Sequence, residues 1–168
     1  MKKTKSIPDG QAVGTPGINN HVVDNRFKKI RRIKQRKQSD CGVACVAMTA
    51  GVTYQEAFKA FNFSKGKSSF FTTRKQLENA LNKLGCRVTK LPFKSWAEIP
   101  GRAILPVNRG GGGSYYHWIV FDGKDVIDPN PLKPPRQDAF DRYRSSCNYL
   151  LVKAAKIKPS PSTEGDAA

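Results

Sequence analysis

The chain has 168 residues, with 30 Lys and Arg against 13 Asp and Glu, and a formal net charge of +17. Its hydrophobic content of 38% is enough to bury a core, which excludes a fully disordered chain. No apolar run approaches the roughly 18–20 residues that a membrane span needs, and no apolar signal-peptide segment follows the basic N-terminus. We therefore expect one folded domain with no membrane contact and no conventional export signal.

Composition divides the chain into three parts. Residues 1–27 are rich in Gly, Pro and Asn without hydrophobic periodicity, which predicts a flexible leader. Residues 156–168 read KIKPSPSTEGDAA and predict a disordered tail. The folded domain is expected at residues 28–155, and we expect it to be a monomer.

Positive charge is concentrated near the N-terminus. Residues 1–37 hold 11 basic and 2 acidic side chains, and the run Arg26–Lys37 has eight basic residues in twelve. Such a run is found in nucleic-acid-binding segments, in segments that bind acidic protein surfaces, and in solvated arms that lead into a domain. The sequence leaves these three interpretations open.

Helix signals occupy the first half of the predicted domain. Ser39 or Asp40 is placed to cap a helix that starts at Cys41, is apolar on all sides and ends at Gly51. Two capping boxes, Thr53–Glu56 and Thr73–Gln76, open two further helices. Their predicted inward-facing residues are Ala57, Phe58 and Phe61 in the first, and Leu77, Leu81 and Leu84 in the second, which stops at Gly85.

Strand signals follow the helices. The short β-type runs cover residues 87–93, 103–108, 115–122, 125–127 and 149–153. Gly, Pro and Asp separate them. Helices first and strands afterwards predict an α+β fold in which N-terminal helices pack on a C-terminal antiparallel sheet.

The cysteines and histidines limit the chemistry. The four cysteines are Cys41, Cys45, Cys86 and Cys147; they form no CxxC pair and have no nearby histidines, so we expect no zinc site and no other cofactor. We expect all four to be reduced thiols in a cytosol-like compartment. Of the two histidines, His21 lies in the predicted leader, which leaves His117 for catalysis.

Cys41 is the candidate nucleophile. At the first turn of a buried helix it faces the positive end of the helix dipole, which favours the thiolate. Gly42 is expected to leave the backbone open to a substrate. Six residues upstream, the side-chain amide of Gln35 can join the backbone N–H of Cys41 as a two-donor oxyanion hole. Taken alone, this segment favours the interpretation of Cys41 as a small buried residue.

A predicted hairpin supplies the partners of the nucleophile. Its turn is at Asp122-Gly123, His117 lies on the first strand, and Asp128 ends the second. Antiparallel pairing can bring the two side chains together, so that Asp128 holds the imidazole and His117 takes the proton of the cysteine. A strand histidine and an Asp-Pro turn are ordinary structural features separately. Their combination with Cys41 indicates a Cys-His-Asp triad.

These motifs carry a family resemblance. The pattern Gln35-x4-Asp-Cys-Gly-x-Ala-Cys, then Ala103-Ile-Leu-Pro-Val, His117-Trp-Ile-Val and Asp128-Pro129, resembles the bacteriocin-processing (double-glycine) papain-like cysteine peptidases over roughly residues 30–152. The resemblance implies a cysteine endopeptidase that cuts after a Gly-Gly pair in a protein or peptide. It implies that Cys41 is the nucleophile, His117 the base, Asp128 its orienting partner and Gln35 the oxyanion donor. Gln38, three residues before Cys41, is too close for the papain-type arrangement.

The chain departs from the best-known members of that family. We expect that no transporter domain follows the peptidase-like segment and that a basic leader precedes the nucleophile. Free-standing relatives include the toxin ends of interbacterial weapons. By analogy we expect an antibacterial toxin or effector that a secretion system delivers into a target cell, that acts in the cytoplasm and that has an immunity protein as a partner.

Two other functions stay open at the level of sequence. A papain-fold deamidase or acyl-transferase would use the same triad and the same thioester chemistry. A nucleic-acid-binding module would bind through Arg26–Lys37 and leave the triad incidental.

Overall fold

The structure is a computed structural model. It describes residues 30–107, 117–136, 143–145 and 147–154. The predicted leader at 1–27, with His21, and the predicted tail at 156–168 lie outside the described residues, as does the first part of the basic run.

Three α-helices form first, as the sequence predicted. They are α1 (Cys41–Ala50), α2 (Tyr54–Phe61) and α3 (Arg74–Lys83). Both capping boxes are present, because Thr53 and Thr73 each accept a hydrogen bond from the third helical residue and receive its side chain in return. Gly51 ends α1 in the left-handed conformation, with φ of 71°. Of the side chains predicted to face inward, Phe58, Phe61 and Leu84 are only partly buried.

The strands follow in the predicted order. They are β1 (Cys86–Leu91), β2 (Ala103–Val107), β3 (His117–Phe121), β4 (Val126–Ile127) and β5 (Tyr149–Ala154), with a 3-10 turn η2 (Trp96–Glu98) between β1 and β2. They form one antiparallel sheet in the order β1-β5-β2-β3-β4. Of the predicted strand ends, residue 108 and residues 115 and 116 lie outside the described residues.

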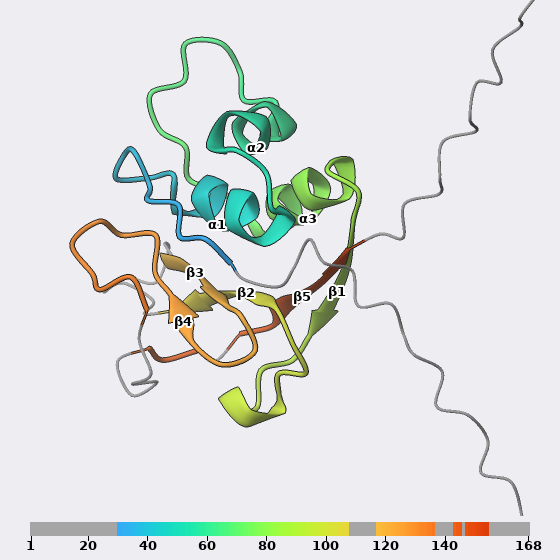
Figure 1. The fold of residues 1–168 in the computed structure, drawn as a ribbon. Coiled ribbons are helices and arrows are strands. Elements are labelled where there is room, and N and C mark those ends of the chain that lie inside the picture. The colour runs from blue at the N-terminus through green and yellow to red at the C-terminus, as the bar shows by residue number, and fades with distance from the viewer. Residues whose placement is uncertain (1–29, 108–116, 137–142, 146, 155–168) are drawn as a thin grey trace, which may run out of the picture.

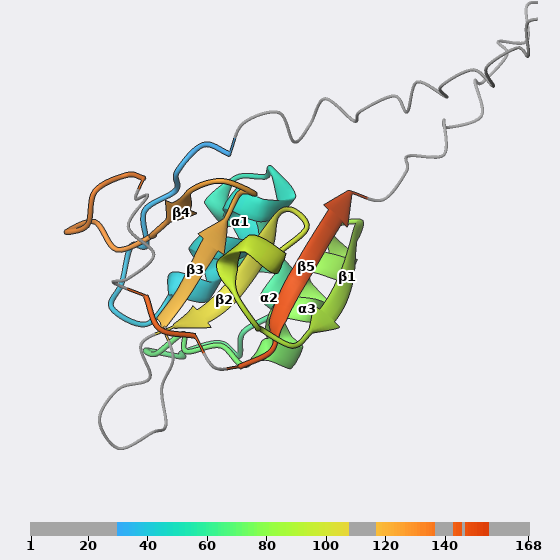
Figure 2. The same cartoon turned by 90° about the horizontal axis from the view of Figure 1, so that it is seen from below.

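The fold has two layers. The three helices cover one face of the sheet (Figure 1), and the loop that carries η2 crosses the other face (Figure 2). Between helices and sheet, α1 is buried on all sides, and its Val43 and Val46 pack with Ile104 and Val120 of the strands. A second apolar cluster on the far face includes Ile119 and the η2 loop. The predicted α+β fold is confirmed. Among the described residues, no helix is both long and apolar enough to cross a membrane.

Candidate active site

Cys41 is the first residue of α1 and is only 6% exposed. Asp40 occupies the N-cap position, but its side chain makes no capping bond, so the predicted side-chain cap is wrong. Its Oδ2 accepts hydrogen bonds from the backbone N–H groups of Arg36 and Lys37, at 3.2 and 3.1 Å, and from the Tyr54 hydroxyl at 2.5 Å. The carboxylate therefore organises the loop before the helix instead of the helix end.

The space beside Gly42 is occupied by the protein. A Cβ at this position would lie 2.0 Å from Thr72 Oγ1. The close packing of the segment around Thr72 against α1 therefore requires a glycine here. The Trp118 indole N–H donates to the Thr72 carbonyl at 3.1 Å and holds that segment in place. The expectation that Gly42 opens the backbone to a substrate is therefore wrong.

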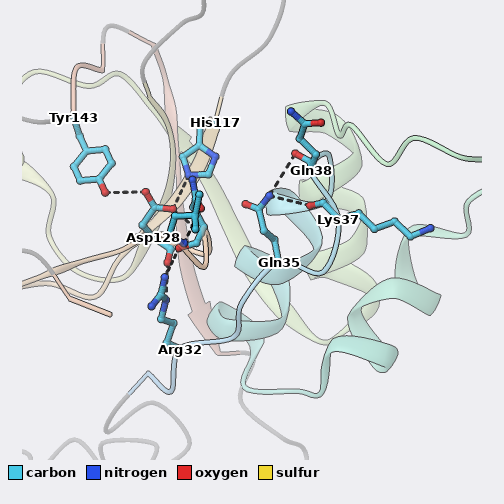
Figure 3. Close-up of polar contacts among 9 residues, drawn as sticks. Arg32, Gln35, Lys37, Gln38, His117, Asp128 and Tyr143 are labelled. Carbon is cyan, nitrogen blue, oxygen red and sulfur yellow. Dashed lines mark hydrogen bonds and ion pairs between the residues drawn. The ribbon is translucent and has the colours of Figure 1, made fainter. Parts of the chain in front are cut away.

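The hairpin brings His117 and Asp128 together. Strands β3 and β4 pair antiparallel, and Asp122 N–H donates to the Asp125 carbonyl across the turn. His117 Nε2 then lies 2.7 Å from Asp128 Oδ1 (Figure 3). Because a carboxylate only accepts, Nε2 carries the hydrogen, and the other ring nitrogen is left for a second partner.

Asp128 is buried, at 1% exposed, with every oxygen of its carboxylate engaged. Besides His117, the backbone N–H of Asn130 donates to Oδ1 and the Tyr143 hydroxyl donates to Oδ2, both at 2.8 Å. Burial raises the pKa of this carboxyl, but the hydrogen bond and charge of His117, then the Asn130 and Tyr143 bonds, outweigh it and lower the pKa. Asp128 is therefore ionised at neutral pH.

The electrostatics of His117 favour its charged form. Burial lowers the pKa of the imidazole, but hydrogen bonds to Asp128 and to Cys41, together with the charges of both partners, raise it to about 9. An imidazole that contacts both a carboxylate and a cysteine is placed to exchange protons with the thiol and with a substrate.

Three hydrogen bonds to backbone carbonyls join the helical half of the molecule to the Asp128 loop. Arg32 Nε donates to the Asp128 carbonyl at 2.8 Å, and the same guanidinium donates to the Asn130 carbonyl (Figure 3). The backbone N–H of Gln35 donates to the Pro129 carbonyl at 2.9 Å. Arg32, which the sequence offered only as part of a basic run, thus serves to fix the loop of the candidate triad.

Gln35 lies beside the His117–Asp128 pair with its amide turned away. Its Nε2 donates to the carbonyls of Lys37 at 2.9 Å and Gln38 at 3.4 Å, while Oε1 lies on the side of His117 (Figure 3). That oxygen is buried and has no hydrogen-bond partner among the described residues. The structure therefore places the predicted donor at the site with its acceptor atom facing it.

The structure also describes Cys45, possible metal ligands and two residues of the site that the sequence analysis did not identify. Cys45 is fully buried, and burial first, then the charges of Cys41 and Asp128, raises the pKa of its thiol. No group of three His, Cys, Asp or Glu in the described part of the chain is arranged to hold a metal.

Sequence reasoning missed Asn130 and Tyr143. Asn130 could have been found, because an Asp side chain often accepts from the N–H two residues on, whereas nothing in the sequence marks Tyr143.

Comparisons with known proteins place the fold. Neither a family model nor a curated protein matches this chain. Among solved structures, the peptidase domain of Streptococcus ComA, a bifunctional ABC transporter, is similar with a TM-score of 0.58 and 19% identity, over 74% of this chain and 97% of that one. A double-glycine motif protease from an AMS/PCAT transporter, solved with its leader peptide, is similar with a TM-score of 0.54 and 20% identity, over 76% and 93%. The chain therefore has the fold of these two transporter peptidase domains, as its motifs predicted.

Proposed function

We propose that this protein is a cysteine endopeptidase whose triad is Cys41, His117 and Asp128. The observation that carries the proposal is the 2.7 Å contact between the His117 imidazole and the buried Asp128 carboxylate, with Cys41 close enough to the imidazole to raise its pKa. Cys41 is also the first residue of a buried helix. The likeness of fold to double-glycine peptidase domains supports the same conclusion.

The proposed reaction follows from the charges of these groups. His117 takes the proton of the Cys41 thiol, and the sulfur attacks the carbonyl carbon of the scissile peptide bond to form a tetrahedral oxyanion. His117 gives its proton to the leaving amine, so the C–N bond breaks and a thioester remains. His117 then takes a proton from water, the hydroxide attacks the thioester, and the thiolate leaves. Asp128 keeps the imidazole oriented and offsets its charge throughout.

The oxyanion is proposed to be held by the backbone N–H of Cys41 and by the Gln35 amide. For the second donor, the amide must turn so that Nε2 takes the place of Oε1. The turn exchanges bonds to the Lys37 and Gln38 carbonyls, one of them long at 3.4 Å, for a bond to a full negative charge. The same turn points Oε1 at those two carbonyl oxygens, so it requires the backbone of Lys37 and Gln38 to move as the oxyanion forms.

We propose that the substrate is cut after a Gly-Gly pair. Cys41 is 6% exposed, and Thr72 crowds the backbone at the next residue. A chain that reaches the sulfur must approach closely with its backbone, which glycine allows and a Cβ obstructs. The partner is thus an extended protein or peptide segment with a flexible Gly-Gly site.

The setting we propose is that of an antibacterial effector acting in the cytoplasm of a target cell, with a cognate immunity protein. This part rests on analogy with free-standing relatives of the family. Its test is growth of bacteria that express the chain in the cytosol: arrest by the wild type and normal growth with Cys41→Ala support it, whereas equal growth contradicts it.

A deamidase or acyl-transferase with the same triad is the second candidate, because the thioester intermediate is shared. The deciding experiment is mass spectrometry of proteins from cells that express the wild type, Cys41→Ala, or Cys45→Ala as the matched control on the same helix. New chain ends with the wild type and Cys45→Ala, and none with Cys41→Ala, support a peptidase. Intact chains with glutamine converted to glutamate would overturn it in favour of a deamidase.

A further inference from the structure

A cavity outside the candidate triad is lined by the segment that precedes α1. It has a volume of about 760 Å³ and is bounded by residues 30–34 and 36, the C-terminal end of α1 and the start of α2. Its cationic lining residues are Arg31, Arg32, Lys34, Arg36 and Arg102. Among the described residues that line it, Glu56 is the sole carboxylate. The cavity is therefore strongly positive.

Glu56 does not neutralise these cations. Its Oε2 accepts from both the backbone N–H and the hydroxyl of Thr53, each at 2.7 Å, as part of the α2 capping box. The Thr53 side-chain bond, followed by the backbone bond, lowers the pKa of Glu56. Its charge is thus committed to the helix end, and the cavity retains an excess of positive charge.

Arg102 adds a cation that is partly removed from water. Its Nη1 lies 3.5 Å from the Thr49 carbonyl. Burial lowers the pKa of its guanidinium to about 10, although the charge of Asp122 opposes the change. An anion that enters the cavity would compensate part of this desolvation.

The rest of the lining selects among anions. Ile33, Met48 and Val52 give the cavity an apolar part, and none of its described lining residues is aromatic. Single-stranded nucleic acid depends on aromatic rings for base stacking, which this lining lacks. Guanidinium groups beside aliphatic side chains suit a peptide, because arginine pairs with carboxylates in two-point contacts and the apolar part accepts aliphatic residues.

We propose that this cavity binds an acidic segment of the protein substrate, in which carboxylates alternate with aliphatic side chains. That the partner is the substrate rests on the proposed peptidase function, but the binding itself does not. The cavity is joined to the candidate triad, because Arg32 lines it and also holds the Asp128 carbonyl. A segment bound there would anchor the substrate beside the candidate triad.

The test is fluorescence anisotropy with Cys41→Ala protein and a labelled peptide in which glutamate alternates with leucine. The comparison peptide has glutamine in place of glutamate. Arg31→Gln with Lys34→Gln removes two exposed charges from the cavity. Arg87→Gln with Lys90→Gln removes two exposed charges from β1, an edge strand of the sheet that does not line the cavity. We expect the cavity pair to weaken glutamate-peptide binding by about tenfold, and the control pair by about twofold or less.

Three results would overturn the assignment. Equal losses in the two variants would mean general attraction by a basic protein. Equal binding of the two peptides would exclude carboxylate recognition. Tighter binding of a labelled oligothymidylate, lost in the same cavity variant, would assign the cavity to nucleic acid. None of these results bears on the triad, which the cleavage experiment tests separately.

A different observation concerns Tyr143, which is 5% exposed and donates to Asp128 Oδ2 at 2.8 Å. Oδ1 already accepts from His117 and Asn130, so the tyrosine is the hydrogen-bond donor to the second oxygen. Its segment is fixed to the sheet, because Ser145 Oγ donates to the Pro106 carbonyl at 2.9 Å.

We infer that Tyr143 is a positioning residue that holds the Asp128 carboxylate in the orientation in which it bonds His117. Other groups that face Asp128 are the Arg32 guanidinium on its carbonyl and the Cys45 thiol of α1, which its raised pKa keeps neutral. None of them replaces the hydroxyl on Oδ2. Its loss leaves a buried oxygen without a donor and makes the carboxyl easier to protonate.

Tyr143→Phe tests this inference, with Tyr149→Phe of β5, also buried, as the matched control. The NMR signal of His117, one of only two histidines, reports ionisation of its partner at low pH. We expect that inflection to move to higher pH in Tyr143→Phe and iodoacetamide alkylation of Cys41 near neutral pH to slow about threefold to tenfold. An unchanged inflection and an unchanged alkylation rate would overturn the inference while leaving the triad intact.

Discussion

Two buried aspartates flank the candidate site, and they are held in different ways. Asp40 is 0% exposed and Asp128 is 1% exposed, and each accepts a tyrosine hydroxyl, from Tyr54 and Tyr143 respectively. The other donors to Asp40 are backbone N–H groups of its own loop, and its Oδ1 has no hydrogen-bond partner among the described residues. Asp128 instead has both oxygens bonded, and one of them holds the His117 side chain.

The different hydrogen-bond partners give the two aspartates different roles. Asp40, in the helical half, fixes the backbone of the loop that leads from Gln35 to the nucleophile. Asp128, at the end of the sheet hairpin, fixes a side chain that transfers protons. The two halves meet through the contacts of Arg32 and Gln35 with the 128–130 loop. A defect in the first aspartate should therefore appear mainly in stability, and a defect in the second mainly in rate.

The largest effects are expected at the junction of the two halves. Cys41→Ala from the helical half and His117→Ala from the sheet should each abolish cleavage of a site identified by mass spectrometry, since each removes a reacting group. Both variants should keep the wild-type circular dichroism spectrum.

In the wild type, Cys41 should be alkylated much faster than Cys45, which is buried. Equal labelling of all four thiols in the folded protein would contradict the assignment of Cys41 as the nucleophile.

The next largest effect tests the helical half alone. Gln35→Ala should lower kcat on the order of 10²–10³, the usual cost of one oxyanion donor. Gln35→Glu should lower it similarly, because a carboxylate has the same shape but cannot donate. Gln38→Ala is the matched control, since its side chain is exposed three residues away. A large loss in Gln38→Ala with normal rates in Gln35→Ala would move the oxyanion hole.

The same substitution at each aspartate compares their two roles directly. Asp128→Asn should lower kcat by about tenfold to a thousandfold, because the amide orients the imidazole without offsetting its charge. Asp40→Asn should leave kcat nearly unchanged and lower the free energy of unfolding by about 1–3 kcal/mol, since it weakens a buried hydrogen-bonded carboxylate. Urea unfolding and cleavage kinetics measure both. The reverse pattern would refute the division of tasks.

The pH dependence gives a smaller effect with a defined sign. The pKa of His117 is raised from 6.5 to about 9 in the folded protein. Its charged form therefore stabilises the fold fully below pH 6.5, and this contribution is lost as the pH rises through about 9. The melting temperature of the wild type should fall over this interval by more than that of His117→Ala. Parallel curves for the two proteins would contradict the ion pair.

The features of the fold and of the candidate site differ in how well the sequence predicts them. Capping boxes, the hairpin turn and the succession of helices and strands along the chain are local or near-local signals, so the sequence predicted the fold class and the approach of His117 to Asp128. Tyr143 was not predictable, because its contact with Asp128 joins distant segments without a motif. Asp40 was misread for a related reason. Propensity suggests that an aspartate before a helix caps it, whereas here the hydroxyl of Tyr54 and the turned loop compete successfully for the carboxylate.

Gly42 provides the smallest predicted effect and tests the packing of the helical half. Gly42→Ala should destabilise the protein by about 1–3 kcal/mol, the usual cost of overpacking, because Thr72 Oγ1 lies 2.0 Å from the new Cβ. Thr72 cannot simply rotate away, since a β-branched side chain has few rotamers and its carbonyl is held by Trp118. Thermal unfolding measures the change, with Gly101→Ala as the control, because nothing lies within 4 Å of a Cβ there. If both substitutions cost equally little, Thr72 is free to move, and the crowding that we invoke for Gly-Gly specificity would lose its support.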